Sequence, residues 1–253
     1  MGRPKGNTMT SAVLFDLEGT LIQTPWEDPR HVSEFRLQTR RKLIQLTIPP
    51  SVLEGTERST LMRNKASEYV ERNFSKVHAQ EFHKGMIEFL RQYEVDAAEN
   101  SNLFPETIST LEELRRRGVK MGLVTNTSRE AVEIVFRLHA LKRYFEVVVT
   151  REDVKKLKPD PEGLLLAIRR LGVNDFFMVG DLAFDMLAAK NANGTSVFVK
   201  RSGKDGMSAH ADHIVHSLRE VPSIIQVGIK NQSREWLVKC SRLKKSKRSI
   251  DSA

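Results

Sequence analysis

From residue 104 onward, short apolar runs alternate with longer segments whose apolar residues recur at helical spacing. The apolar runs lie at 120–125, 145–149, 176–180, 195–199 and near 212–215, and the helical patterns lie at 105–118, 129–140, 161–171, 183–192 and 218–229. Strands that alternate with helices predict βαβ units and a parallel sheet. Residues 12–16, AVLFD, add a buried strand near the start of the chain. We therefore expect a doubly wound, Rossmann-like α/β core over 12–24 and 104–229.

Residues 25–103 interrupt this pattern with sequence in which no strand is expected. Helical spacing covers 31–47, 52–73 and 79–97, and Pro49-Pro50 separates the first of these helices from the second. An insert of about 80 residues is long enough to bury a small core of its own. We therefore expect a separate α-helical domain inserted into the α/β core.

The net charge of +9 is concentrated at the two ends of the chain. Residues 230–253 contain eight Lys and Arg against two acidic residues, and residues 1–11 contain two basic residues and no acid. The body is nearly neutral, so a nucleic acid or an acidic partner would be bound by segment 230–253. A charge run at a chain end is more often a solvated, flexible tail, and we favour that interpretation of both ends.

Composition narrows the class of protein. With 40% hydrophobic and 29% charged residues, the chain is an ordinary globular protein. Cys240 is its single cysteine, which excludes an internal disulfide and a cysteine-based zinc site and favours a reducing, cytoplasmic location. No apolar run approaches the ~18–20 residues that a membrane-spanning helix needs, so we expect no membrane partner.

Polar residues follow the predicted strands, and ligands of a parallel sheet bind outside the carboxyl ends of its strands. The first strand ends in Asp16-Leu17-Glu18-Gly19. Asp16 can act as a nucleophile that accepts a phosphoryl group, and Glu18 can protonate a leaving oxygen and then activate water. A turn with solvated acids is an equally good explanation of this motif alone.

Two further strand ends carry groups suited to an anion. Thr125 and Asn126 follow the strand 120–125 and would surround a phosphate with a hydroxyl, an amide and backbone N–H groups, although ordinary helix capping also explains them. Lys158 lies in a loop stiffened by Pro159 and Pro161, where it can offset the charge of a carboxylate and a phosphate. The alternative for Lys158 is a solvated surface charge.

The strand 176–180 is followed by Asp181 and Asp185 at i, i+4 spacing. Two carboxylates suit Mg²⁺, which keeps several waters and is bound by one or two acidic side chains. A capping acid and a surface acid would give the same spacing.

Taken in this order, each at a strand end, the four motifs closely resemble those of the haloacid dehalogenase superfamily, whose members are mostly Mg²⁺-dependent phosphatases. The resemblance covers residues 12 to 229, with 25–103 in the position of that family's helical cap, and the whole is similar to the phosphoglycolate phosphatase-like branch. It implies catalytic roles for Asp16 (nucleophile), Glu18 (general acid/base) and Lys158 (charge stabilisation), a phosphate site at Thr125, Asn126 and Lys158, and a Mg²⁺ site at Asp16, Glu18 through its backbone carbonyl, Asp181 and Asp185.

Glu18 departs from the usual pattern of the family, which has Asp at this position in phosphatases. Glutamate reaches about 1.5 Å further, the length of one C–C bond. The enolase-phosphatases of methionine salvage are similar in carrying Glu here. Dehalogenase and phosphonatase members lack an acid at this position, so Glu18 argues against both activities.

The resemblance implies a Mg²⁺-dependent phosphatase that hydrolyses a small phosphorylated metabolite through an aspartyl phosphate. A large cap that closes over the cleft favours a small substrate over a phosphoprotein. The alternatives are a phosphomutase acting on a sugar phosphate and a non-catalytic nucleic-acid-binding or scaffold protein acting through its basic tails. A monomer or a homodimer is expected.

Overall fold

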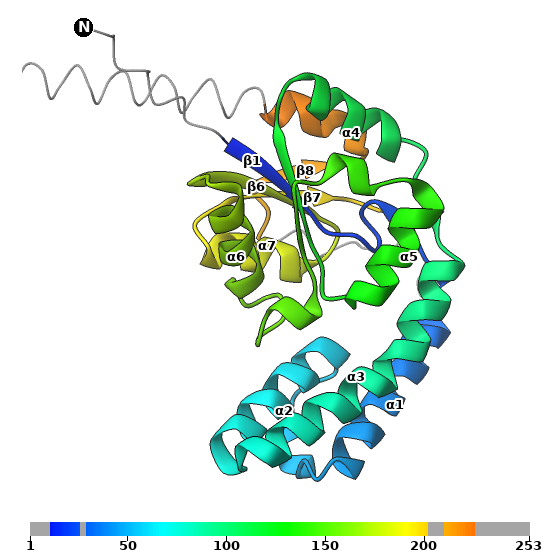
Figure 1. The fold of residues 1–253 in the computed structure, drawn as a ribbon, viewed down its shortest axis with the longest axis vertical. Coiled ribbons are helices and arrows are strands. Elements are labelled where there is room, and N and C mark those ends of the chain that lie inside the picture. Colours follow the sequence, from blue (N-terminus) through cyan, green and yellow to red (C-terminus); the bar gives the residue numbers. More distant parts are fainter. Residues whose placement is uncertain (1–10, 26–28, 202–209, 226–253) are drawn as a thin grey trace, which may run out of the picture.

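The computed structural model describes residues 11–25, 29–201 and 210–225 (Figure 1). The basic segment 230–253, with Cys240, lies outside the described residues. In the described part, no helix combines the length and the apolar character that crossing a membrane requires.

The core is a parallel sheet of six strands in the order β5-β4-β1-β6-β7-β8. The strands are β1 (Ser11–Phe15), β4 (Lys120–Val124), β5 (Val147–Val149), β6 (Asp175–Gly180), β7 (Thr195–Val199) and β8 (His213–Val215). Every pair of neighbouring strands is parallel. The predicted α/β fold is therefore confirmed.

Helices cover both faces of this sheet. Val13 and Phe15 of β1 pack in one buried cluster with the helices α4 (Thr107–Arg116) and α5 (Arg129–His139). Ala12 and Leu14 point to the opposite face, where α6 (Glu162–Leu171) and α7 (Ala183–Asn191) complete a second cluster. Successive side chains of a strand point to opposite faces, so a strand buried on both sides is apolar throughout.

Two helices of the core begin or end at residues whose side chain or backbone favours a helix end. The Ser128 hydroxyl accepts a hydrogen bond from the Ala131 N–H, so Ser128 is the N-cap of α5 and begins the helix predicted from residue 129. Gly172 ends α6 with φ of 65°, a left-handed conformation that glycine adopts at little cost. Short 3-10 helices occur at Pro50–Leu53, Lys142–Tyr144, Arg151–Asp153 and Leu218–Glu220.

Three helices form a second body beside the carboxyl edge of the sheet (Figure 1). They are α1 (Pro29–Gln45), α2 (Ser59–Asn73) and α3 (Lys76–Glu99), and we call them the cap. Their buried residues form a cluster separate from the two core clusters, with Leu43, Met62 and Leu90 among its members. The chain enters and leaves the cap through a short antiparallel pair, β2 (Ile22–Gln23) and β3 (Asn102–Leu103), which the sequence analysis did not predict.

The predicted helix 52–73 is shorter in the structure, because α2 begins at Ser59. The chain turns at Gly55, whose φ is 68°, and no continuous helix passes through that conformation. The Pro49-Pro50 break is confirmed, since α1 ends at Gln45.

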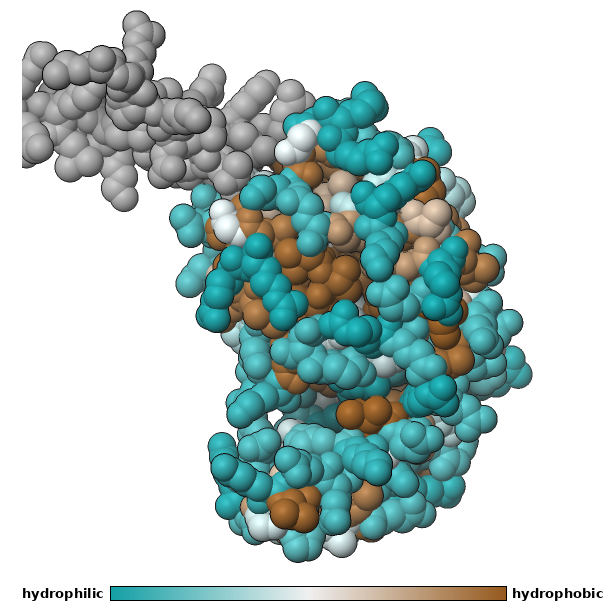
Figure 2. Space-filling model, viewed as in Figure 1, coloured by the Kyte–Doolittle hydropathy of each residue, from teal (hydrophilic) through white to brown (hydrophobic). Residues whose placement is uncertain are grey.

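The long helix α3 links the cap to the core. The Arg91 guanidinium donates two hydrogen bonds of 2.8 Å to the Glu130 carboxylate of α5 on the surface. Deeper in the same contact, Arg151 donates to the Glu94 carboxylate, and the Ser128 N–H donates to the same carboxylate at 3.2 Å. Helix α3 and the core therefore meet through one exposed and one buried ion pair, and Figure 2 shows the hollow that remains between cap and core.

Candidate active site

Asp16 lies directly after β1, where the register of the sheet brings several strand ends together. Phe15 pairs with Leu123 on one side and with Val179 on the other, and the Asp16 N–H donates to the Val179 carbonyl at 2.9 Å. The side chains that follow β1, β4 and β6 consequently lie at one edge of the sheet. Asp16 itself is 7% exposed.

Lys158 is the centre of the charged network at this edge. It is 4% exposed, and its Nζ donates to Asp16 Oδ1 at 2.7 Å, Asp185 Oδ1 at 2.6 Å and the Val124 carbonyl at 2.9 Å. Burial alone would lower the pKa of Lys158, but the carboxylates of Asp16 and Asp185 outweigh it and hold this pKa above its ordinary value. The lysine is thus a fixed positive charge in contact with Asp16, as the sequence interpretation required.

The two residues predicted to hold phosphate lie beside this lysine. The Asn126 side chain pairs with the Lys158 backbone, accepting from its N–H at 3.0 Å and donating to its carbonyl at 3.3 Å. Thr125 is buried, and its hydroxyl accepts from the Thr127 N–H at 3.2 Å. Both residues line the cavity described below, and phosphate binding by them stays a prediction.

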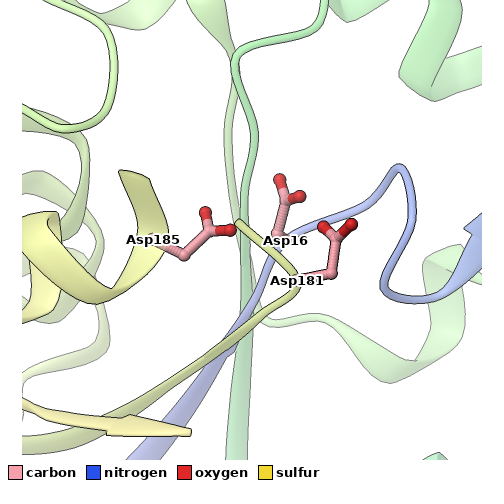
Figure 3. A group of neighbouring side chains, drawn as sticks. All are labelled: Asp16, Asp181 and Asp185. Carbon is pink, nitrogen blue, oxygen red and sulfur yellow. The ribbon is translucent and has the colours of Figure 1, made fainter. Parts of the chain in front are cut away.

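Asp16, Asp181 and Asp185 form a buried cluster in which one carboxylate oxygen of each lies within 4.8 Å of the others. Figure 3 shows the carboxylates of Asp16 and Asp181 side by side and that of Asp185 directed toward Asp16. Burial raises the pKa of Asp185 to about 6, with Asp16 adding to the shift and Lys158 opposing it. When ionised, the three carboxylates exceed the charge of Lys158 by two, which is the charge of one divalent cation.

The donor set of this cluster fits Mg²⁺, an ion that prefers oxygen ligands. Both Asp185 oxygens already accept hydrogen bonds, Oδ1 from Lys158 and Oδ2 from the Leu182 N–H at 3.1 Å. Asp181 Oδ1 also accepts from the Thr20 hydroxyl at 3.3 Å, and which of these acids hold the ion directly stays a prediction. The Glu18 side chain is not part of the cluster, and its contribution through a backbone carbonyl stays a prediction.

Glu18 is set apart from the other acids by its pKa, which burial raises to about 7. The neighbouring carboxylates of Glu94 and Asp16 raise it further, whereas a hydrogen bond with the Thr127 side chain and the charge of Lys158 lower it. Glu94 comes from the cap helix α3. A carboxyl group with this pKa can both donate and accept a proton near neutral pH.

The site opens into a cavity of about 300 Å³ between the core and the cap. Its core wall contains all but one of the predicted site residues, namely Asp16, Glu18, Thr125, Asn126, Lys158 and Asp185. Its cap wall contains Arg36, Arg58 and Arg63 together with Phe35 and Tyr93. Sequence reasoning missed these cap residues, because no strand end marks them.

Among described residues, the three cap arginines make no ion pair. The Arg58 guanidinium lies 5.2 Å from the centre of the Phe184 ring. Burial and the nearby Arg151 lower the pKa of Arg63 to about 10, at which it keeps its charge at neutral pH. The cavity thus has a wall of carboxylates and a lysine on the core and a wall on the cap whose charged residues are three arginines and Glu94.

This fold and site, with an aspartate, a lysine and an acid cluster at the carboxyl edge of a parallel sheet beneath a helical cap, define a phosphatase-type hydrolase. Residues 13–199 match the family described as haloacid dehalogenase-like hydrolase. The chain belongs to that family.

Similar proteins agree with this assignment. The pyrophosphatase PpaX of Bacillus mycoides is 32% identical over 200 residues, which are 75% of this chain and 83% of the relative. PpaX of Oceanobacillus iheyensis is 27% identical over 224 residues, 84% of this chain and 95% of the relative. The crystal structure of a HAD phosphatase from Thermococcus onnurineus has a TM-score of 0.53 and 32% identity, and the match covers 85% of this chain and 98% of that one.

Proposed function

We propose that the protein is a Mg²⁺-dependent phosphatase that acts on a small phosphorylated substrate through an aspartyl phosphate on Asp16. The observation that carries this proposal is the contact of the buried Lys158 Nζ with Asp16 Oδ1 at 2.7 Å, in a cavity that is also lined by Glu18, an acid whose pKa is about 7. This hydrogen bond from Lys158 fixes the orientation of the Asp16 side chain and sets a positive charge against it. Such pre-organised charge is a large part of the catalytic effect in phosphoryl transfer.

Two chemical steps follow from these residues. In the first, an Asp16 oxygen attacks phosphorus, the bond from phosphorus to the leaving oxygen breaks, and the carboxyl group of Glu18 gives its proton to that oxygen. In the second, the Glu18 carboxylate takes a proton from water, and the water oxygen attacks phosphorus. The bond to Asp16 then breaks, which releases phosphate and restores the carboxylate.

Asp16 and Asp181 would hold the Mg²⁺, with Asp185 supporting them. When bound, the ion would offset the charge that builds up on the phosphoryl oxygens. Lys158 contributes positive charge to the same oxygens, and the side chains of Thr125 and Asn126 supply polar groups beside it.

The cap wall supports a narrower substrate class, in which the leaving group carries a negative charge of its own. Three arginines face a site whose opposite wall binds the transferred phosphoryl group, and guanidinium groups suit phosphate and carboxylate. The curated relatives named pyrophosphatase are consistent with this class, because one phosphate of pyrophosphate would leave as an anion. We therefore expect the best substrates to be pyrophosphate and small phosphate esters that carry a carboxylate or a second phosphate.

The test is phosphate release from pyrophosphate and a panel of small phosphate esters, with Mg²⁺ and with EDTA, for the wild type and Asp16→Asn. Release that requires both Mg²⁺ and Asp16 is the expected result. Conversion of a sugar phosphate to its isomer without free phosphate would establish a phosphomutase instead. A folded wild-type protein that releases phosphate from no substrate would favour the non-catalytic alternative.

A further inference from the structure

The loop that carries Lys158 is held by side chains from both the core and the cap. The N–H groups of Lys155 and Lys156 donate to the Glu162 carboxylate of α6 at 3.1 and 3.0 Å. The N–H of Lys158 donates to Asn126 at 3.0 Å. These three contacts all come from the core.

Leu157, between them, is held by the cap. Its N–H donates to Asn64 Oδ1 at 3.2 Å, and its carbonyl accepts from Asn64 Nδ2 at 3.1 Å. Asn64 lies on α2, and Leu157 is buried. One amide side chain from each body therefore pairs with successive residues of the loop, Asn64 with Leu157 and Asn126 with Lys158.

The backbone carbonyl and the backbone N–H of Leu157 differ in how much they depend on Asn64 for a hydrogen-bond partner. The Leu157 carbonyl also accepts from the Asp160 N–H at 3.0 Å, so it keeps a partner without Asn64. Asn64 is the acceptor for the Leu157 N–H. A buried N–H without an acceptor costs free energy, so the loop should shift toward water when Asn64 is absent.

Helix α2 meets the loop a second time one turn further on. The Lys156 Nζ lies 3.0 Å from Glu68 Oε1, but both side chains are well exposed. Exposed ion pairs contribute little, so the part-buried Asn64 contact is the stronger of the two contacts by which α2 holds the loop. The residue before Asn64 is Arg63, which lines the substrate cavity.

We propose that Asn64 is a positioning residue that couples the seating of the cap to the catalytic lysine, an inference that rests on the proposed function. When α2 lies against the core, Asn64 holds Leu157 and thereby fixes the backbone from which Lys158 reaches Asp16. Arg63, which would contact the substrate, and Asn64, which holds the loop, are then adjacent residues of one helix. The active site is complete only with the cap in place.

The experiment compares Asn64→Ala and Asn64→Asp with Asn73→Ala in the full-length protein. Asn73 lies on the same helix, is exposed, and its side chain donates to the Tyr69 carbonyl of that helix, which makes it a matched control. The Asp variant keeps an acceptor for the Leu157 N–H but sets a carboxylate oxygen against the Leu157 carbonyl. Both Asn64 variants should lower kcat for p-nitrophenyl phosphate by about tenfold or more with KM changed less than about twofold, because small misplacements of a catalytic group reduce rate rather than binding.

Amide hydrogen exchange of Leu157 and Lys158 distinguishes a local change in the loop from a general loss of stability. A general loss would speed exchange across the whole protein and not at these two amides alone. Both amides should exchange at least about tenfold faster in Asn64→Ala, with the central strands and Asn73→Ala unchanged. Unchanged exchange, or faster exchange with kcat at the wild-type value, would overturn the proposal. If the wild type hydrolyses no substrate at all, the proposed function fails, and the exchange measurement still decides whether Asn64 holds the loop.

Discussion

The two walls of the active-site cavity differ in whether their charged side chains form ion pairs. On the core wall, Lys158 forms ion pairs with Asp16 and Asp185 at distances of 2.6–2.7 Å, and the three side chains are almost fully buried. On the cap wall, Arg36, Arg58 and Arg63 are partly exposed and make no ion pair among described residues, although the Glu94 and Glu152 carboxylates attract Arg63 from further away. The charged side chains of the core wall are thus held in position before a substrate binds. The arginines of the cap wall, in contrast, can be neutralised by an anionic group of the substrate. The comparison suggests that the reaction is built into the core and that substrate choice is built into the cap.

The largest expected effect tests the core wall. Asp16→Asn keeps the size of the side chain but removes the nucleophilic oxygen and the counter-charge of Lys158. Turnover of every substrate should fall by at least about a thousandfold, as is usual when a covalent catalyst is removed. Steady-state phosphate release measures it, and far-ultraviolet circular dichroism shows whether the variant is folded. Activity within about tenfold of wild type would place the nucleophile elsewhere.

The second effect follows from the pKa of Glu18, which is about 7. Glu18 is protonated below this pH and loses the proton above it, so kcat/KM for an alkyl phosphate should fall about tenfold per pH unit on the alkaline side. Glu94→Gln removes a neighbouring negative charge and should move this limb to lower pH. A pH profile that is flat through the alkaline range in both proteins would exclude Glu18 as the general acid.

A third test separates the acids of the buried cluster. Asp181→Asn should weaken Mg²⁺ binding, measured by calorimetry without substrate, by more than about tenfold. Asp185→Asn should weaken it less, because both oxygens of Asp185 are already bound to Lys158 and Leu182. Equal losses in the two variants would make Asp185 a direct ligand, as the sequence analysis predicted.

The cap wall gives a smaller and more selective effect. Arg63→Met should raise KM for pyrophosphate about tenfold and leave p-nitrophenyl phosphate within about twofold, because only in pyrophosphate does the leaving group already carry a negative charge before the bond to phosphorus breaks. Arg72→Met is the matched control, since Arg72 lies on the same helix but is exposed and does not line the cavity. Equal changes for both substrates would remove the distinction between the two walls.

The smallest effect concerns the surface contact between the two bodies. Arg91 and Glu130 are each about half exposed, so Arg91→Gln should lower the free energy of unfolding in urea by less than about 1 kcal/mol. Catalysis should be unaffected. A larger loss of stability, or a fall in kcat, would mean that this exposed pair seats the cap together with the buried contacts of Glu94 and Asn64.

The core wall could be predicted from the sequence because its residues follow strands. Alternation of strands and helices fixes a parallel sheet, and a parallel sheet brings Asp16, Thr125 and Asp181 to one edge even though up to 165 residues separate them. The structure places all of the predicted site residues at that edge. Their chemical roles still follow from the family resemblance and stay predictions until the variants are measured.

The cap wall could not be predicted, because it depends on which face of each helix meets the core. Arg58 and Arg63 have no local pattern that distinguishes them from other arginines of the same segment, such as Arg72. Asn64 is equally inconspicuous, since its partner Leu157 is 93 residues away. Other polar residues of the cap, such as His78, His83 and Lys84, do not line the active-site cavity.

The most direct test of the central claim is to trap the phosphoryl group on Asp16. With p-nitrophenyl phosphate the first step needs no proton from Glu18, because p-nitrophenolate leaves as the anion. The second step needs Glu18 as a base, which Glu18→Gln lacks. This variant should therefore accumulate the covalent intermediate from p-nitrophenyl phosphate and Mg²⁺. The reaction would be quenched in acid and the peptides mapped by mass spectrometry. The account predicts one added HPO₃ on the peptide that contains Asp16, absent in the double variant with Asp16→Asn. Release of p-nitrophenol at the wild-type rate, with no phosphorylated peptide in either variant, would contradict it.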